Sequence, residues 1–111
     1  MRKFHRIRSR RKLFLKSIAS SLVLREKIET TVARAKEIRP FVERLLTIAK
    51  KSNTASLRLL LARLPKGSAE KLFYEIAPRY KDRKGGYLRI IKKAETRKRD
   101  GTPIALIEFV K

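Results

Sequence analysis

The sequence predicts an α+β fold in which about four helices pack on a small mixed sheet of about three strands that ends in a C-terminal hairpin. Apolar residues recur at helical spacing through most of the chain, whereas β-branched and aromatic residues dominate after Gly85 and Gly86. The length of 111 residues fits a single domain, 1–111, with a short basic N-terminal arm at about 1–10.

The first predicted helix runs from about Ser9 to Leu24. Its apolar positions recur at helical spacing and form a narrow stripe: Leu15, Ile18, Ala19, Leu22 and Val23. A short strand is expected around Ile28, because Thr30 and Thr31 are β-branched. Thr31 is also expected to cap the helix that follows.

The second predicted helix runs from Val32 to Lys51 and has one apolar and one charged face. The apolar face comprises Ala35, Ile38, Val42, Leu45, Leu46 and Ala49, with Phe41 at its edge. Most charged residues, Arg44 among them, lie on the opposite face. Pro40 lacks an N–H and crowds the preceding turn, so we expect a kink or a break near Ile38 and Arg39.

Two shorter helices are predicted next. The segment 52–54 is expected to stop the second helix and cap a third, whose apolar residues are Leu57, Leu60, Leu61 and Leu64 and which ends at Pro65. A fourth helix follows the turn at 66–68 and is expected to close at Pro78. Beyond Gly86, residues 87–93 and 104–110 predict an antiparallel hairpin with a long basic tip.

Positive charge dominates the composition. The chain has 31 Lys and Arg against 10 Asp and Glu, which gives a net charge of +21. Repulsion at this density opposes a compact state, so a polyanionic partner is expected, nucleic acid first and an anionic membrane next. Residues 1–16 hold eight basic side chains and no acid, and residues 79–99 hold ten against two acids.

Few titratable groups are suited to catalysis. His5 is the only histidine, and there is no cysteine, so the sequence gives little support to a metal or nucleophile site. The acids fit structural roles; Glu75, for example, lies four residues from both Lys71 and Arg79, as in ordinary helix-surface pairs. We therefore predict no enzyme activity, no catalytic residue, no metal site, no cofactor and no small-molecule substrate.

The sequence also bears on location. No apolar run approaches the length of a membrane span, and the basic start lacks the apolar region of a signal peptide. An Arg-rich start can mimic an organelle transit peptide, but this one continues directly into the first predicted helix. We expect the start to belong to the mature protein, with no membrane partner.

The two basic zones predict nucleic-acid binding. A solvated face is the alternative, but it would leave eight like charges in 1–16 repelling one another. Arginine suits RNA because its planar guanidinium binds phosphate bidentately and stacks on bases. Tyr80 and Tyr87 either stack on an unpaired base or pack the fourth helix against the hairpin, and the sequence favours neither. The predicted RNA-binding residues are Arg2, Lys3, Arg6, Arg8, Arg10, Arg11, Lys12, Lys16, Arg79, Arg83, Lys84, Arg89, Lys92, Arg97, Lys98 and Arg99.

Several stretches resemble a known family over nearly the whole chain and in the expected order. They are residues 27–39 (KIETTVARAKEIR), 72–80 (LFYEIAPRY), 83–90 (RKGGYLRI) and 99–108 (RDGTPIALIE). Together they are similar to the bacterial-type large-subunit ribosomal protein seventeen family. Family members usually start with a longer basic arm, and they usually have His-Glu where this chain has Arg25 and Glu26.

The resemblance implies a cytoplasmic, structural constituent of the large ribosomal subunit. Such a protein would bind large-subunit ribosomal RNA near the exit-tunnel side, contact neighbouring large-subunit ribosomal proteins, and support subunit assembly and translation. The contacts that the family's longer arm makes are in doubt for this chain, because its arm is compressed to residues 1–6.

Three rival functions can be separated from this one by experiment. A DNA-architectural protein would dimerise and bend duplex DNA, which gel filtration and a DNA competition would reveal. A small nuclease would need carboxylates such as Asp82, Glu95 and Asp100 around metal ions, and a metal-dependent cleavage assay tests it. A regulatory RNA-binding protein could use the same basic surfaces, but it would not sediment one-to-one with the large subunit.

Overall fold

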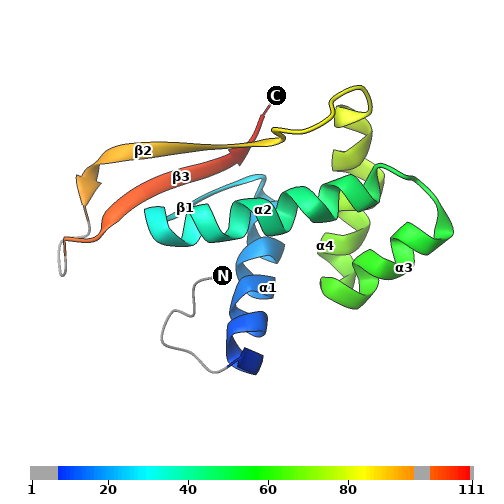
Figure 1. The fold of residues 1–111 in the computed structure, drawn as a ribbon, viewed down its shortest axis with the longest axis horizontal. Coiled ribbons are helices and arrows are strands. Elements are labelled where there is room, and N and C mark those ends of the chain that lie inside the picture. Colours follow the sequence, from blue (N-terminus) through cyan, green and yellow to red (C-terminus); the bar gives the residue numbers. More distant parts are fainter. Residues whose placement is uncertain (1–7, 97–100, 111) are drawn as a thin grey trace.

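The computed structural model describes residues 8–96 and 101–110, with side chains described for 12–94 and 101–110. These residues form four α-helices and a three-stranded sheet, so the predicted α+β class is confirmed (Figure 1). The N-terminal seven residues and the hairpin tip at 97–100 lie outside the described residues. The single domain 1–111 with its arm at about 1–10 stays a prediction.

Helix α1 spans Arg8–Arg25 and strand β1 spans Lys27–Thr31, close to their predicted bounds. The predicted apolar stripe of α1 is buried at Leu15, Ala19, Leu22 and Val23. The helix ends at Arg25, and the next residue, Glu26, has a φ of +66° and donates its backbone N–H to the Leu22 carbonyl at 2.7 Å. This left-handed residue turns the chain sharply from α1 into β1.

Helix α2, Val32–Ala49, begins as predicted, because Thr31 Oγ1 accepts the Arg34 backbone N–H at 3.2 Å. Of the kink or break expected near Ile38 and Arg39, the break is wrong, because α2 continues through Pro40; the kink stays a prediction. Because Pro40 has no N–H, the carbonyl of Lys36, four residues earlier, lacks its usual helical donor. Both residues are exposed, so water can bind that carbonyl. Burial of the opposite face of the helix offsets the cost of the lost bond.

Helix α3, Thr54–Arg63, follows a reciprocal cap between Asn53 and Ser56. Asn53 Oδ1 accepts the Ser56 N–H at 2.7 Å, and Ser56 Oγ accepts the Asn53 N–H at 3.2 Å. Only part of the predicted apolar stripe is covered. Leu60 is buried, whereas Leu61 is 41% exposed.

The fourth helix does not close at Pro78 as predicted. Helix α4, Lys66–Lys71, continues into a π-helical turn, Leu72–Ile76, and a 3-10 turn, Ala77–Tyr80. The Ala77 N–H bonds the Leu72 carbonyl, one residue further back than in an α-helix. The hydrogen-bond register changes immediately before the proline. Pro78 therefore lies in the first turn of the 3-10 segment, where its missing N–H matters least.

Strands β2, Leu88–Thr96, and β3, Pro103–Phe109, form the predicted hairpin, and β3 lies between β1 and β2. The sheet is antiparallel throughout, whereas a mixed sheet was predicted. β1 and β2 run in the same direction, but β3 separates them, so no parallel pair forms. Ile107 sits opposite Ile28 on one side and Ile90 on the other.

Helix α2 lies at the centre of the fold. It contacts all three strands on one side and α1 and α3 on the other (Figure 1). Alternate residues of β3 are buried on the face that α2 covers: Ala105, Ile107 and Phe109. Every other element is therefore positioned relative to this helix.

We expect Ile107→Ala to lower the free energy of unfolding by about 2–5 kcal/mol, because it opens a cavity in the centre of the core. The matched control is Ile91→Ala on β2, where the side chain is 44% exposed and the expected loss is about 0.5 kcal/mol or less. Urea unfolding of the two variants measures both values. Equal losses would contradict the proposed packing.

Candidate nucleic-acid interface

The structure describes the predicted RNA-binding residues to different extents. Six lie outside the described residues: Arg2, Lys3, Arg6, Arg97, Lys98 and Arg99. Three lie in the first turn of α1, where only the backbone is described: Arg8, Arg10 and Arg11. The side chains of seven are described: Lys12, Lys16, Arg79, Arg83, Lys84, Arg89 and Lys92.

Lys12 and Lys16 border a groove of about 670 Å³ between α1, α2 and α3, which we call the helical groove. It is lined by Lys12, Leu15, Lys16, Phe41, Arg44, Leu45, Ala62 and Arg63. Sequence reasoning missed Arg44 and Arg63 as site residues. No local signal indicates them, because they meet the two lysines only when three helices pack together.

Arg83 and Lys84 are exposed on the loop 81–86. Hydrogen bonds to Glu43 of α2 and to Lys50, the residue that follows α2, hold this loop in place. Lys50 Nζ donates to the Arg83 carbonyl and to Tyr87 Oη, the latter at 2.8 Å. Glu43 of α2 accepts the Tyr87 backbone N–H at 3.2 Å. The loop backbone is thus anchored beside α2, while Arg83 and Lys84 are exposed to solvent.

The two tyrosines beside this loop are core residues. Tyr80 is 5% exposed and Tyr87 is 2% exposed, and their rings meet edge to face at a centroid distance of 5.4 Å. Burial raises the pKa of Tyr80, and its hydroxyl donates to the Val110 carbonyl. Of the two roles that the sequence left open, packing between the fourth helical segment and the hairpin fits this burial, and base stacking does not.

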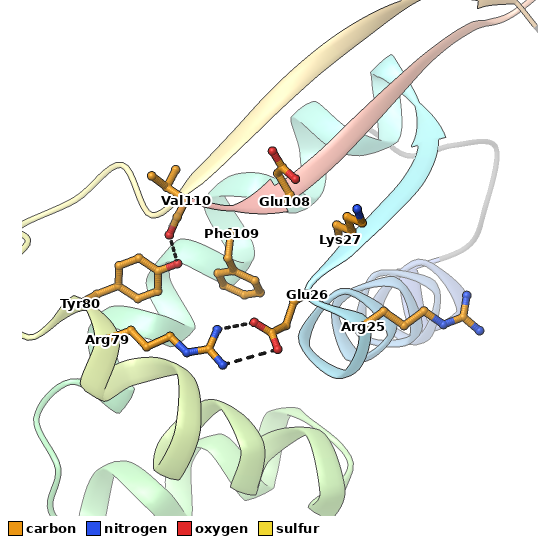
Figure 2. A pocket seen from close by; sticks show the side chains of 8 residues that line it. All are labelled: Arg25, Glu26, Lys27, Arg79, Tyr80, Glu108, Phe109 and Val110. Atoms are coloured by element: carbon orange, nitrogen blue, oxygen red, sulfur yellow. Dashed lines mark hydrogen bonds and ion pairs between the residues drawn. The ribbon is translucent and has the colours of Figure 1, made fainter.

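Arg79 binds Glu26 in a second hollow, of about 590 Å³, between the end of α1 and the C-terminal part of β3 (Figure 2). Figure 2 shows the guanidinium of Arg79 directed at both carboxylate oxygens of Glu26. Lys71 Nζ lies 3.4 Å from the same carboxylate and donates to the Leu24 carbonyl at 2.7 Å. Sequence reasoning instead paired Lys71 and Arg79 with Glu75, which was wrong for the main contact.

The pKa values of this pair follow from the contact. The hydrogen bond from Arg79 lowers the pKa of Glu26 below its ordinary value, with a smaller contribution from Lys71. The same bond raises the pKa of Arg79. Both groups are therefore charged at neutral pH, and the pair connects α1 to the helical segment that ends at Tyr80.

Arg89 and Lys92 lie on β2 in different settings. Arg89 faces Glu108 across the strand pair, with Arg89 Nε 2.6 Å from Glu108 Oε1. Lys93 reaches across the sheet to Glu29. Lys92 is exposed and sits opposite Ala105. Arg89 therefore contributes to the sheet, whereas Lys92 faces solvent.

The ion pairs divide the predicted residues into two groups. The pairs within the described residues use Glu26, Glu29, Glu43, Glu70 and Glu108. Among the seven described candidates, Arg79 and Arg89 take part in them. Lys12, Lys16, Arg83, Lys84 and Lys92 take part in none of them. Among the seven described candidates, these five are therefore the ones that remain available to a polyanion.

The described residues offer little else for chemistry. Within 12–94 and 101–110, no three His, Asp or Glu side chains gather closely enough to hold a metal ion. Among the described helices, none has the length and apolar character to cross a membrane.

Comparison with known proteins gives a consistent result. The family model described as Ribosomal protein L17 matches residues 14–110. The chain is 49% identical over 108 residues to the large ribosomal subunit protein bL17 of a Hydrogenobaculum species, covering 96% of this chain and 92% of the relative. It is 50% identical over 109 residues to the protein of that name from Persephonella marina, covering 96% and 88%. A third, from Sphingopyxis alaskensis, is 49% identical over 110 residues, covering 98% and 78%.

We expect Glu26→Gln to lower the free energy of unfolding at pH 7 by about 1 kcal/mol or less, because an exposed ion pair is screened by water. The folded-state pKa of Glu26 is depressed, so its stabilisation is complete above the unfolded-state pKa and is lost as pH falls through the folded-state value. Urea unfolding should therefore show the wild type and the variant converging in acid.

The control is Glu75→Gln, which removes an exposed carboxylate from the helical segment that carries Lys71 and Arg79. Its effect should be smaller at pH 7. A larger loss for Glu75→Gln than for Glu26→Gln would show that Glu26 is not the main partner of Arg79 and Lys71.

Proposed function

The chain belongs to the ribosomal protein L17 family, and from that premise we propose that its exposed cations bind large-subunit ribosomal RNA. Its role is that of a structural constituent of the large ribosomal subunit, not of an enzyme. Its location is cytoplasmic, within that subunit. By binding the RNA, the chain would support subunit assembly and translation.

The observation that carries the proposal is the division of the cations by ion pairing. The net charge of +21 requires compensation, and among the described candidates glutamates pair with Arg79 and Arg89, which join parts of the fold. Lys12, Lys16, Arg83, Lys84 and Lys92 project outside these pairs. RNA phosphates would neutralise them and release bound counterions, which favours binding at low salt.

Two surfaces of the fold are involved in the proposal. Helix α1 extends from α2 on the side opposite the sheet, whereas the loop 81–86 and the hairpin lie beyond the other side (Figure 1). We propose that the first surface uses residues 1–16 and the second uses the basic residues of 79–99. Within the second, Arg79 and Arg89 would act mainly by positioning the backbone that carries Arg83, Lys84 and Lys92.

The finer placement of the chain in the subunit rests on the family resemblance alone. We propose a site near the exit-tunnel side, with neighbouring large-subunit ribosomal proteins as further partners. Constitutive one-to-one sedimentation with the large subunit is the result expected of a structural constituent. A regulatory RNA-binding protein would appear there only in part or under some conditions.

The double variant Arg83→Gln with Lys84→Gln tests the second surface. We expect its affinity for large-subunit ribosomal RNA to fall at low salt. We also expect the slope of log affinity against log salt to become shallower by about 1–2, because each phosphate contact contributes about one. Filter binding over a salt series measures both.

The matched control is Lys51→Gln with Arg58→Gln, which removes the same charge from exposed positions outside both surfaces. It should change the slope less. Equal slopes for the two double variants would contradict the second surface. Displacement of the ribosomal RNA by an equal mass of duplex DNA would favour a DNA-binding role instead.

A further inference from the structure

We propose that the helical groove receives an unpaired nucleotide of the bound RNA, with the base against Phe41 and the phosphates at the cationic rim. This inference rests on the proposed function, because it specifies the form in which the RNA meets the first surface. It also extends that surface beyond residues 1–16 to α2 and α3, where sequence reasoning placed no RNA contact.

The groove is built from matching faces of two helices. Lys12, Leu15 and Lys16 recur at spacings of three and four along α1, so they share one face. Phe41, Arg44 and Leu45 recur in the same way along α2. The third wall comes from Ala62 and Arg63 of α3. Each long helix therefore contributes an apolar floor and basic side chains to the same hollow.

The floor is apolar and fixed by the core. Leu15 is 3% exposed and Leu45 is 1% exposed, so both are part of the packed interior. Phe41 is only partly buried and packs against that interior, so part of its side chain remains accessible from the groove. A partly accessible aromatic ring on a packed apolar floor is a surface on which a base can stack.

The rim carries charge of one sign. Every ionisable residue that lines the groove is a cation: Lys12, Lys16, Arg44 and Arg63. None of the ion pairs within the described residues involves one of these four. The hollow at Arg79 differs, because Glu26 and Glu108 lie among its lining residues. Mutual repulsion at the groove therefore lacks the compensation that the fold provides elsewhere.

The combination selects an unpaired nucleotide over a duplex. A duplex presents phosphates to the rim, but its stacked bases cannot reach the floor. An unpaired nucleotide presents both a π-face and phosphates, and the groove volume of about 670 Å³ is ample for one. Arginine at the rim suits either part, since its guanidinium binds phosphate and stacks on bases.

The chain next to the groove favours RNA over an acidic protein segment. Arg8, Arg10 and Arg11 immediately precede Lys12 in the sequence, and the first acid of the chain is Glu26. A continuous run of basic residues follows a phosphate backbone, whereas an acidic side chain at the groove would leave the Phe41 ring without a stacking partner. We therefore commit to RNA and treat an acidic peptide as a contrary outcome.

The test compares a short single-stranded RNA with a duplex of the same sequence, using the full chain and fluorescence anisotropy. Phe41→Ala should weaken single-strand binding by roughly 5- to 150-fold and leave duplex binding nearly unchanged. Phe41→Leu keeps the apolar volume but removes the ring, so it should weaken single-strand binding in the same direction. Thermal melting of Phe41→Leu checks that the fold persists.

The cationic rim has its own matched pair of variants. Both double variants remove two positive charges from the region of α2 and α3. Arg44→Gln with Arg63→Gln should weaken single-strand binding more than Lys51→Gln with Arg58→Gln, because only the first pair lines the groove. In addition, 4-thiouridine in the single strand should crosslink to the peptide that contains Phe41. A crosslink confined to other peptides would overturn the inference.

The outcomes separate this inference from the proposed function. If the wild type binds large-subunit ribosomal RNA but the Phe41 variants bind single strand and duplex as the wild type does, the groove inference fails alone. If the wild type shows no affinity for that RNA, the proposed function fails and the inference with it. If polyglutamate abolishes the Phe41 crosslink as efficiently as unlabelled single strand, the groove takes an acidic partner instead.

Discussion

Glu26, the left-handed residue that follows α1, contacts Arg79 and Lys71, and the division of the cations between the fold and a partner depends on contacts of this kind. With only ten acids against thirty-one basic residues, the position of each carboxylate decides which cations support the fold. Glu108 and Glu29 do so on the sheet. Glu43 joins α2 to the start of the hairpin through the Tyr87 N–H. Of the basic residues in the two proposed surfaces, those outside these pairs remain available to a polyanion.

Helix α2 positions the basic surfaces relative to one another. Its buried face supports the sheet and the other helices, while Lys50 and Glu43 fix the loop that carries Arg83 and Lys84. Phe41 and Arg44 of the same helix line the helical groove beside α1. One element therefore sets the distance between the two proposed RNA-binding surfaces.

Local sequence patterns predicted most of the elements but little of the site. Periodicity indicated α1, α2 and the hairpin, because those signals act within one element. Glu26 gave no such signal, because its contact with Arg79 joins segments that are 53 residues apart. A break at Pro40 and a helix end at Pro78 did not occur, because exposure of the freed carbonyl and a change of helical register are tertiary effects. The parallel neighbours implied by a mixed sheet fail because β3 lies between β1 and β2.

The central claim concerns the basic residues of the two proposed surfaces: those outside the ion pairs contact RNA, whereas those within the pairs support the fold. Ultraviolet crosslinking of the intact large subunit, with crosslinked peptides identified by mass spectrometry, tests it most directly. The account predicts RNA crosslinks at Lys12 and Lys84 and none at Lys71, which Glu26 binds. Crosslinks at Lys71 with none at Lys12 or Lys84 would contradict it.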